Sequence, residues 1–216
     1  MTTKQLATLS LICVICFAGI IFALHFLRSD LNPINRPTSE YAVGRYGIMM
    51  STAFFSMSVA TFSLLIGLYK GISKTTRSRA GLIFLGVWGV AVLIAMLFPI
   101  DPDGTELTTT GKIHRINGPV AFLCLSLGIF LVTRSFNRDQ NWRSFYPLAR
   151  TLSWLILGMF VITGINIGTQ LGLEGLCQRV FLVIMLSWFI LTTLHLRSVS
   201  LKNRIHVENK IQNFSA

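Results

Sequence analysis

The sequence predicts an all-α, polytopic membrane protein in which six transmembrane helices form one bundle. Only 12% of its 216 residues are charged and 52% are hydrophobic, which is more apolar surface than a water-soluble domain of this size can bury. Six apolar runs of about twenty residues are each long enough to cross a hydrocarbon core of about 30 Å. The segments between them are too short for a second folded domain, so residues 1–216 are expected to form one membrane domain.

The expected spans follow one another closely along the chain. They cover residues 6–26, 47–69, 80–99, 113–133, 152–172 and 176–195, and a basic cytoplasmic tail follows over 196–216. The first run is longer than the apolar core of a signal peptide and no A-x-A site follows it, so it is expected to stay as a helix. The second carries many Ser and Thr side chains, which are expected to hydrogen-bond between helices. The third is a continuous apolar run.

The fourth and fifth spans contain residues that modify a simple helix. A fourth helix that began at Pro119 and ended at residue 133 would be only about 22 Å long, too short to cross the membrane. The helix is therefore expected to begin near Gly111 and to accommodate Pro119 as a kink. In the fifth span, Gly164, Gly168 and Gly172 form a ridge of small residues, which is expected to pack closely on a neighbouring helix. The sixth span begins among polar residues.

The distribution of charge predicts the orientation of the bundle. The net charge is +11, and with the N-terminus inside, the outer connections hold equal numbers of acids and cations. The whole positive excess therefore lies on the inner side, as the positive-inside rule requires of a bacterial inner-membrane protein with both termini in the cytoplasm. Topology and contact with anionic lipid explain this charge, so no nucleic-acid partner is expected.

Polar and ionisable residues gather at the outer end of the bundle, in segments 28–47, 98–119 and 166–179. No charged residue lies near the centre of any span. Proton- and ion-coupled carriers generally need such a group at mid-membrane depth, so a coupled transporter is disfavoured. Any functional site is therefore expected at the outer end.

The fourth span supplies the candidate catalytic residue, His114. Four residues share one helix face by i, i+3, i+4 and i+7 spacing, and this face is expected to point into the bundle: His114, Asn117, Gly118 and Ala121. A histidine can exchange a proton near neutral pH, and Asp101 or Asp103 is the candidate acid that would orient it. The alternative is an interfacial histidine whose ring is satisfied by a loop carbonyl.

Arg179 is the main candidate for binding a head group, because a guanidinium pairs bidentately with phosphate or carboxylate. At the start of a helix it also needs a counter-ion, for which Glu174, Asp101 and Glu40 are candidates. We expect His114 and Arg179 to border one cavity, with Asp101 or Glu40 beside them. The candidate ligand-binding residues are Arg179, Gln178, Glu174, Arg45, Tyr41, Glu40, Asn117 and Asn166.

No metal and no cofactor are expected from the sequence. A zinc site built on His25 and His114 would lack a third ligand.

Three short motifs occur in a fixed order along this six-span chain. They are EYAVGRYG (40–47), FPIDPDG (98–104) with TTTGKIH (108–114), and GLCQR (175–179). In this order they resemble the membrane-protein family known as domain of unknown function 998 (DUF998), over nearly the whole chain. The resemblance implies a six-helix bundle that shares the outer polar cluster, and it supplies no activity. The matching residues are Tyr41, Gly44, Gly47, Pro99, Asp101, Gly111, His114, Gln178 and Arg179.

Three classes of function stay open, and the sequence leaves undecided whether the chain is an enzyme. The first is an enzyme or binding protein for a lipid or other amphiphile, with the head group among His114, Arg179 and the acids. The second is a non-catalytic accessory protein whose polar end stabilises the bundle or docks a protein partner. The third is an uncoupled permease for a small solute. An outer cavity favours the first class, a fully paired cluster the second, and a continuous polar path the third.

The orientation is open to a direct test. A reporter enzyme that works only in the cytoplasm should be active when fused after Ala216, because the positive excess holds this end inside. A matched reporter that works only in the periplasm should be inactive at the same position. The reverse pattern of activities would overturn the predicted orientation.

Overall fold

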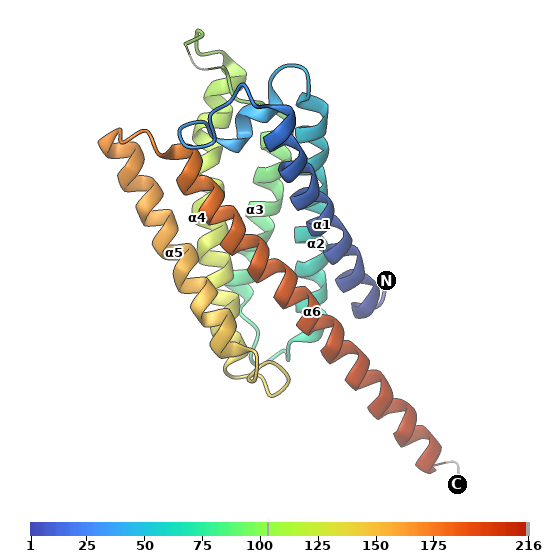
Figure 1. The fold of residues 1–216 in the computed structure, drawn as a ribbon. Coiled ribbons are helices and arrows are strands. Elements are labelled where there is room, and N and C mark those ends of the chain that lie inside the picture. Colours follow the sequence, from blue (N-terminus) through green and yellow to red (C-terminus); the bar gives the residue numbers. More distant parts are fainter. Residues whose placement is uncertain (103, 215–216) are drawn as a thin grey trace.

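Six long helices form the bundle in this computed structural model, and no strand occurs in the residues that it describes, 1–102 and 104–214, with side chains through Lys202 (Figure 1). The helices are α1 (Thr3–Leu27), α2 (Gly47–Gly71), α3 (Arg79–Leu97), α4 (Thr109–Phe136), α5 (Tyr146–Thr169) and α6 (Glu174–Phe214). A short 3-10 helix, η1 (Thr38–Ala42), lies between α1 and α2. All six long helices are apolar enough to span a membrane, which confirms the predicted all-α, six-span class.

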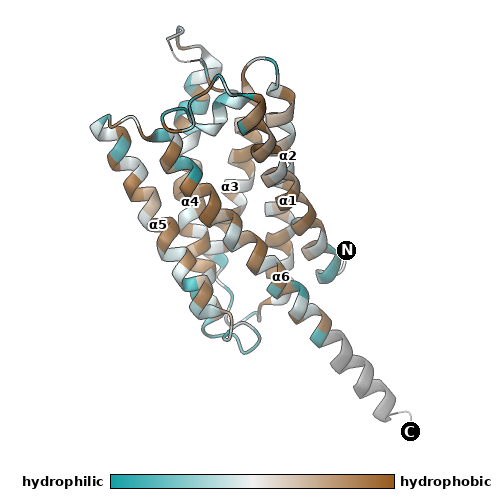
Figure 2. Cartoon of the chain, viewed as in Figure 1, coloured by the Kyte–Doolittle hydropathy of each residue, from teal (hydrophilic) through white to brown (hydrophobic). Residues whose placement is uncertain are grey.

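The helices form a closed ring. Each packs against the helices before and after it in the chain, and α6 also packs against α1. Figure 1 shows η1 and the connections before α4 and α6 at one end, here called the η1 end. Both termini and the other two connections lie at the opposite, terminal end. Apolar residues dominate the middle of the helices and polar residues gather towards both ends (Figure 2).

The start of α4 agrees with the sequence prediction. The helix begins at Thr109, where the Thr108 hydroxyl accepts a hydrogen bond from the Gly111 N–H at 3.1 Å. This side-chain cap satisfies one of the backbone donors that every helix start leaves without a partner. The helix continues through Pro119, as expected.

The ends of α5 and α6 differ from the predicted boundaries. α5 begins at Tyr146, before the expected start at 152, and ends at Thr169 because Gln170 adopts a left-handed conformation with φ of 54°. α6 continues to Phe214, through the segment expected to be a tail. No glycine or proline follows Gly175 in this helix, so nothing in the chain terminates it at residue 195.

Glycines bring the backbones of α3 and α4 into direct contact. A Cβ atom on Gly128 would lie 2.9 Å from the backbone nitrogen of Leu85, and one on Gly81 would lie 2.8 Å from that of Val132. These neighbours are backbone atoms, which cannot move aside as a flexible side chain can. Even a methyl group would therefore push the two helices apart.

The half of α5 nearest the η1 end stands away from its neighbours. The buried residues of α5 are Ala149, Ser153, Ile156 and Asn166, and of these only Asn166 lies in this half. No atom lies within 4 Å of the position that a Cβ would take on Gly164 or Gly168. The predicted close-packing glycine ridge is therefore wrong, because α5 is packed mainly along its other half and the glycine face borders open space.

Hydroxyl groups of α2 connect it to both neighbours. The Ser56 hydroxyl donates to the Cys13 carbonyl of α1 at 2.9 Å, and the Ser58 hydroxyl donates to the Gly89 carbonyl of α3 at 2.9 Å. For these two side chains the predicted interhelical hydrogen bonds are confirmed. Such bonds help to hold helices together in lipid, where burying apolar side chains provides little driving force for helix association.

The terminal end is fastened by one buried acid and one buried indole. Asp139, in the connection between α4 and α5, accepts hydrogen bonds from the Ser73 N–H at 2.8 Å and the Thr76 hydroxyl at 3.1 Å. The Trp142 indole N–H donates to the Gly71 carbonyl at 3.1 Å. These bonds join the α4–α5 connection to the end of α2, so α5 is held firmly at this end.

Replacing Gly128 by alanine tests the backbone contact between α3 and α4. We expect Gly128→Ala to lower the free energy of unfolding by about 1–3 kcal/mol, because the added methyl group overpacks a rigid contact. Unfolding in mixed micelles, followed by helical circular dichroism, measures the change. Gly158→Ala is the matched control, since nothing lies within 4 Å of its Cβ position. Equal stabilities of the two variants would contradict the close contact.

Candidate functional site

A cavity lies between α3, α4, α5 and α6 at the η1 end. Its volume is about 490 Å³, which is within the usual range for sites that bind small molecules. The polar residues that line it are Ser39, His114, Arg115, Asn117, Thr163, Glu174 and Gln178. The half of α5 nearest the η1 end, which is loosely packed, forms one wall through Phe160, Thr163 and Gly164.

Three aromatic side chains line the deep end of the cavity: Trp88, Phe122 and Phe181. Their ring centroids lie 5.9 Å apart for Trp88 and Phe122 and 4.8 Å apart for Phe122 and Phe181. Along α4, Phe122 is roughly 12 Å deeper than His114 at 1.5 Å per residue. The cavity therefore changes from a polar mouth to an aromatic layer near the middle of the bundle. The buried Trp88 indole N–H has no hydrogen-bond partner among the described residues.

His114 points into the bundle, as predicted, and is 8% exposed. Its Nδ1 lies 2.8 Å from the Phe98 carbonyl oxygen. Because a carbonyl can only accept, this nitrogen carries the proton and Nε2 is left as an acceptor. Asn117, one turn further along, donates to the Ala91 carbonyl at 2.8 Å and also lines the cavity. The hydrogen bond to Phe98 matches the alternative prediction, in which a backbone carbonyl satisfies the histidine ring.

Asp101 fixes the start of α4 instead of orienting His114. Its two carboxylate oxygens accept from the N–H of Thr108 at 2.8 Å and from the hydroxyl of the same residue at 2.7 Å. A side chain on Gly111 would collide with this carboxylate. The predicted Asp101–His114 pair is therefore wrong, because the donors around the helix start take the carboxylate. The other candidate acid, Asp103, lies outside the described residues.

Arg179 does not line the cavity, so the expectation that it and His114 border one cavity is wrong. It instead joins α6 to α1, to η1 and to the segment between them. Its guanidinium donates to His25 Nε2 of α1 and to the Tyr41 hydroxyl of η1, each at 2.8 Å. Three backbone carbonyls also accept from it: those of Pro33, Arg36 and Gly175. The His25 Nδ1 is 2.7 Å from the Ile21 carbonyl, so both ring nitrogens are engaged. We call Arg179 with these five direct partners the arginine staple.

The predicted acidic partner of Arg179 is wrong. No carboxylate among the described residues lies within ion-pair distance of its guanidinium. One of the proposed acids, Glu40, instead forms an ion pair with Arg36 at 3.0 Å. Carbonyl and hydroxyl dipoles satisfy the guanidinium donors without the desolvation of a second charge.

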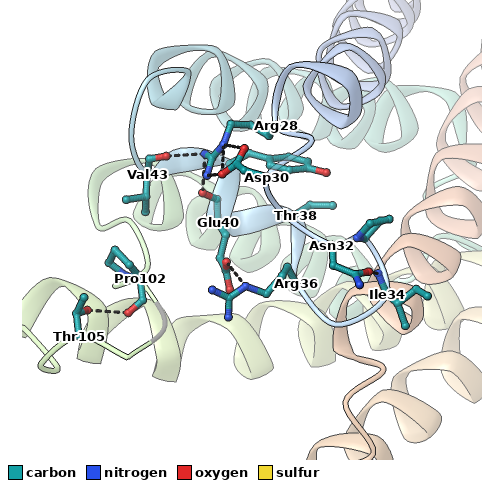
Figure 3. A network of polar contacts seen from close by, with 12 residues as sticks. Arg28, Asp30, Asn32, Ile34, Arg36, Thr38, Glu40, Val43, Pro102 and Thr105 are labelled. Carbon is teal, nitrogen blue, oxygen red and sulfur yellow. Dashed lines mark hydrogen bonds and ion pairs between the residues drawn. The ribbon is translucent and has the colours of Figure 1, made fainter.

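The segment between α1 and α2 is also held by its own charges (Figure 3). Arg28 forms an ion pair with Asp30 at 2.9 Å and donates to the Val43 carbonyl at 2.7 Å. The hydrogen bonds from Arg28 lower the pKa of Asp30. Together with the Arg36–Glu40 ion pair, these contacts hold the segment in a defined conformation. The carbonyls of this segment that accept from Arg179 are thereby kept in place.

Three other predicted binding residues take different positions. Gln178 lines the cavity, and its Oε1 accepts from the Thr38 N–H at 2.6 Å and hydroxyl at 3.0 Å at the start of η1. Glu174 lines the cavity, and its carboxylate has no partner within the described part of the chain. Arg45 is exposed, 5.4 Å from the centre of the Tyr46 ring, and does not line the cavity.

Asn166 closes the turn between α5 and α6 and does not line the cavity. Its Oδ1 accepts from the Leu173 N–H at 3.2 Å. Its buried Nδ2 has no partner among the described residues. In the same described part, no group of three or more His, Cys, Asp or Glu side chains is arranged to hold a metal ion.

Several residues that line the cavity were not predicted from the sequence. They include the polar residues Ser39, Arg115 and Thr163, and also Gly164, Trp88, Phe122 and Phe181. Arg115 follows His114 directly, and its guanidinium has no partner among the described residues. A helix face shared with His114 would not have found it, because adjacent residues on a helix point in different directions. Gly164 carried a signal, its place in a row of small residues, but that signal indicated packing.

The motif residues hold the loops of the η1 end against the helices. Besides the staple and the Asp101 cap, Gly44 has a φ of 84°, which side chains rarely adopt. A side chain on Gly47 would collide with the Ala42 carbonyl. These residues therefore fix the path of the loops at the η1 end, while Glu174 and Arg115, which lie outside the motif residues, line the cavity.

The family comparison confirms the resemblance that the motifs indicate. The family model described as "Protein of unknown function (DUF998)" matches residues 11–195. No curated protein and no solved structure matches the chain.

The arginine staple predicts a large effect of one substitution. We expect Arg179→Gln to lower the free energy of unfolding by about 3 kcal/mol, because several part-buried acceptors lose their donor together. Arg45→Gln removes a cation from the same end and should change stability by less than about 0.5 kcal/mol. Thermal unfolding of both variants in the same detergent measures the difference. Wild-type stability of Arg179→Gln would show that the staple does not hold the bundle.

Proposed function

We propose a binding function for this chain, which belongs to the DUF998 family: it holds an amphiphile from the membrane in the cavity between α3, α4, α5 and α6. The observation that carries the proposal is the gradient along this cavity. Polar side chains line its mouth at the η1 end, and Trp88, Phe122 and Phe181 line its deep end. An amphiphile has the same gradient, so its head group and chain each meet a matching surface.

The wall formed by α5 supports a ligand that comes from the bilayer. Gly164 lines the cavity, and nothing lies within 4 Å of its Cβ position. The neighbouring residues Val161, Ile162 and Ile165 are exposed apolar side chains, as on a helix that faces lipid. A chain moving from the bilayer past this half of α5 would exchange one apolar surrounding for another.

The geometry favours binding over acid–base catalysis. His114 is oriented by the Phe98 carbonyl, and the carboxylate of Asp101 is occupied by Thr108. A general base normally relies on a group that stabilises its protonated form, and a neutral carbonyl does so less well than a carboxylate.

A non-catalytic accessory role is the second candidate, and the arginine staple favours it. Every described partner of Arg179 belongs to the chain itself, so this polar group stabilises the η1 end without a ligand. The two roles differ in what the cavity does. An accessory protein would retain its function with the cavity filled, whereas a binding protein would not. The aromatic layer gives no support to a permease with a continuous polar path.

Photolabelling from within the bilayer tests the cavity directly. The probe is an uncharged long-chain alcohol with a diazirine in mid-chain, added to purified protein in micelles. We expect Gly164→Leu to reduce labelling of the peptides that contain Phe122 and Phe181, because the new side chain fills the cavity. Peptide mass spectrometry measures the labelled fraction.

The matched control is Gly168→Leu, one turn further along the same helix. Its Cβ position is also free of neighbours, but Gly168 does not line the cavity. This variant should be labelled like the wild type. Equal labelling in Gly164→Leu and Gly168→Leu would mean that the probe reaches only the outer surface of the bundle, and the proposed function would fail.

A further inference from the structure

We infer that the amphiphile carries a zwitterionic head group, with an ammonium group beside Glu174 and a phosphate group beside Arg115. The inference rests on the proposed function and adds the chemistry of the head group to it. Glu174 and Arg115 are the charged side chains among the described residues that line the cavity. They have opposite signs and come from different helices, α6 and α4.

Glu174 is an acceptor with no donor. It is the first residue of α6, where the N–H groups of the helix start stabilise a negative charge. In the described part of the chain its carboxylate makes no ion pair or hydrogen bond, so no cation lies beside it. An ammonium group supplies both the positive charge and up to three N–H donors to such a carboxylate.

Arg115 is a cation with no anion. Its exposed guanidinium makes no ion pair or hydrogen bond with the described residues, Glu174 included. Two other arginines at the η1 end, Arg28 and Arg179, are engaged with the chain itself. A guanidinium presents a planar fork of donors that fits two phosphate oxygens at once. Among the residues that line the cavity, Arg115 is thus the group suited to a phosphate.

The balance of one acid and one cation decides between classes of head group. A purely anionic head group would pair with Arg115 and place a second negative charge near Glu174. A purely cationic head group would do the reverse. A zwitterion pairs with both and leaves the total charge of the cavity unchanged. His114 Nε2, an acceptor with no partner among the described residues, adds a hydrogen bond at the same mouth.

Competition with three ligands that share one alkyl chain tests this inference. The ligands are an alkyl phosphoethanolamine, an alkyl phosphate and an alkylamine, compared at equal mole fractions in the micelle against the uncharged diazirine alcohol. For the wild type we expect the phosphoethanolamine to displace the probe at about a tenfold lower mole fraction than either the alkyl phosphate or the alkylamine.

Two variants assign the preference to its residues. Glu174→Gln should remove the advantage of the phosphoethanolamine over the alkyl phosphate and keep its advantage over the alkylamine. Arg115→Gln should do the opposite. Arg45→Gln, which removes a cation outside the cavity, should leave both advantages intact. This pattern would separate a built site from a general attraction between charges at the surface.

The outcomes distinguish the inference from the function on which it rests. If the probe labels the cavity but the three ligands compete equally, the head-group inference is wrong and amphiphile binding stands. The inference also fails if the preference persists in the Glu174→Gln, Arg115→Gln double variant, since other groups would then select the head. If the probe does not label the cavity at all, the proposed function itself has failed.

Discussion

The architecture of the η1 end depends on satisfying the hydrogen-bond donors of one arginine. The guanidinium of Arg179 is partly buried, and a donor left there without a partner would be costly. It finds its acceptors on α1, on η1, on the segment before η1 and on its own helix. These contacts fix where α6 begins relative to the first loop. Gln178, next to it, then holds the start of η1 over the cavity.

The cavity follows from a difference between the two ends of α5. At the terminal end, Asp139 and Trp142 join the α4–α5 connection to the rest of the bundle. At the η1 end, α5 connects to α6 through a turn closed by Asn166, and the staple does not include it. The glycine face between these points has no side chains to fill the space. A helix held firmly at one end and lightly at the other leaves room for a ligand beside it.

The fold could be predicted because its signals are local, whereas the site depends on contacts between distant segments. Hydrophobic length predicted the six helices, and i, i+3 spacing predicted that His114 and Asn117 face inward. The partners of Arg179 could not be predicted, because backbone carbonyls are present at every residue and only the path of the loop selects them. The row of glycines on α5 was ambiguous for a physical reason: small residues permit either close packing or an open cavity.

The central claim is that the cavity holds the chain of an amphiphile, and bromine offers the most direct measurement. Crystals grown with a lipid brominated in mid-chain would be measured at the bromine absorption edge. The account predicts anomalous density inside the cavity, between Trp88, Phe122 and Phe181, at the depth of the aromatic layer. Bromine density confined to the outer surface of the bundle, with the cavity filled by protein side chains or water, would contradict it.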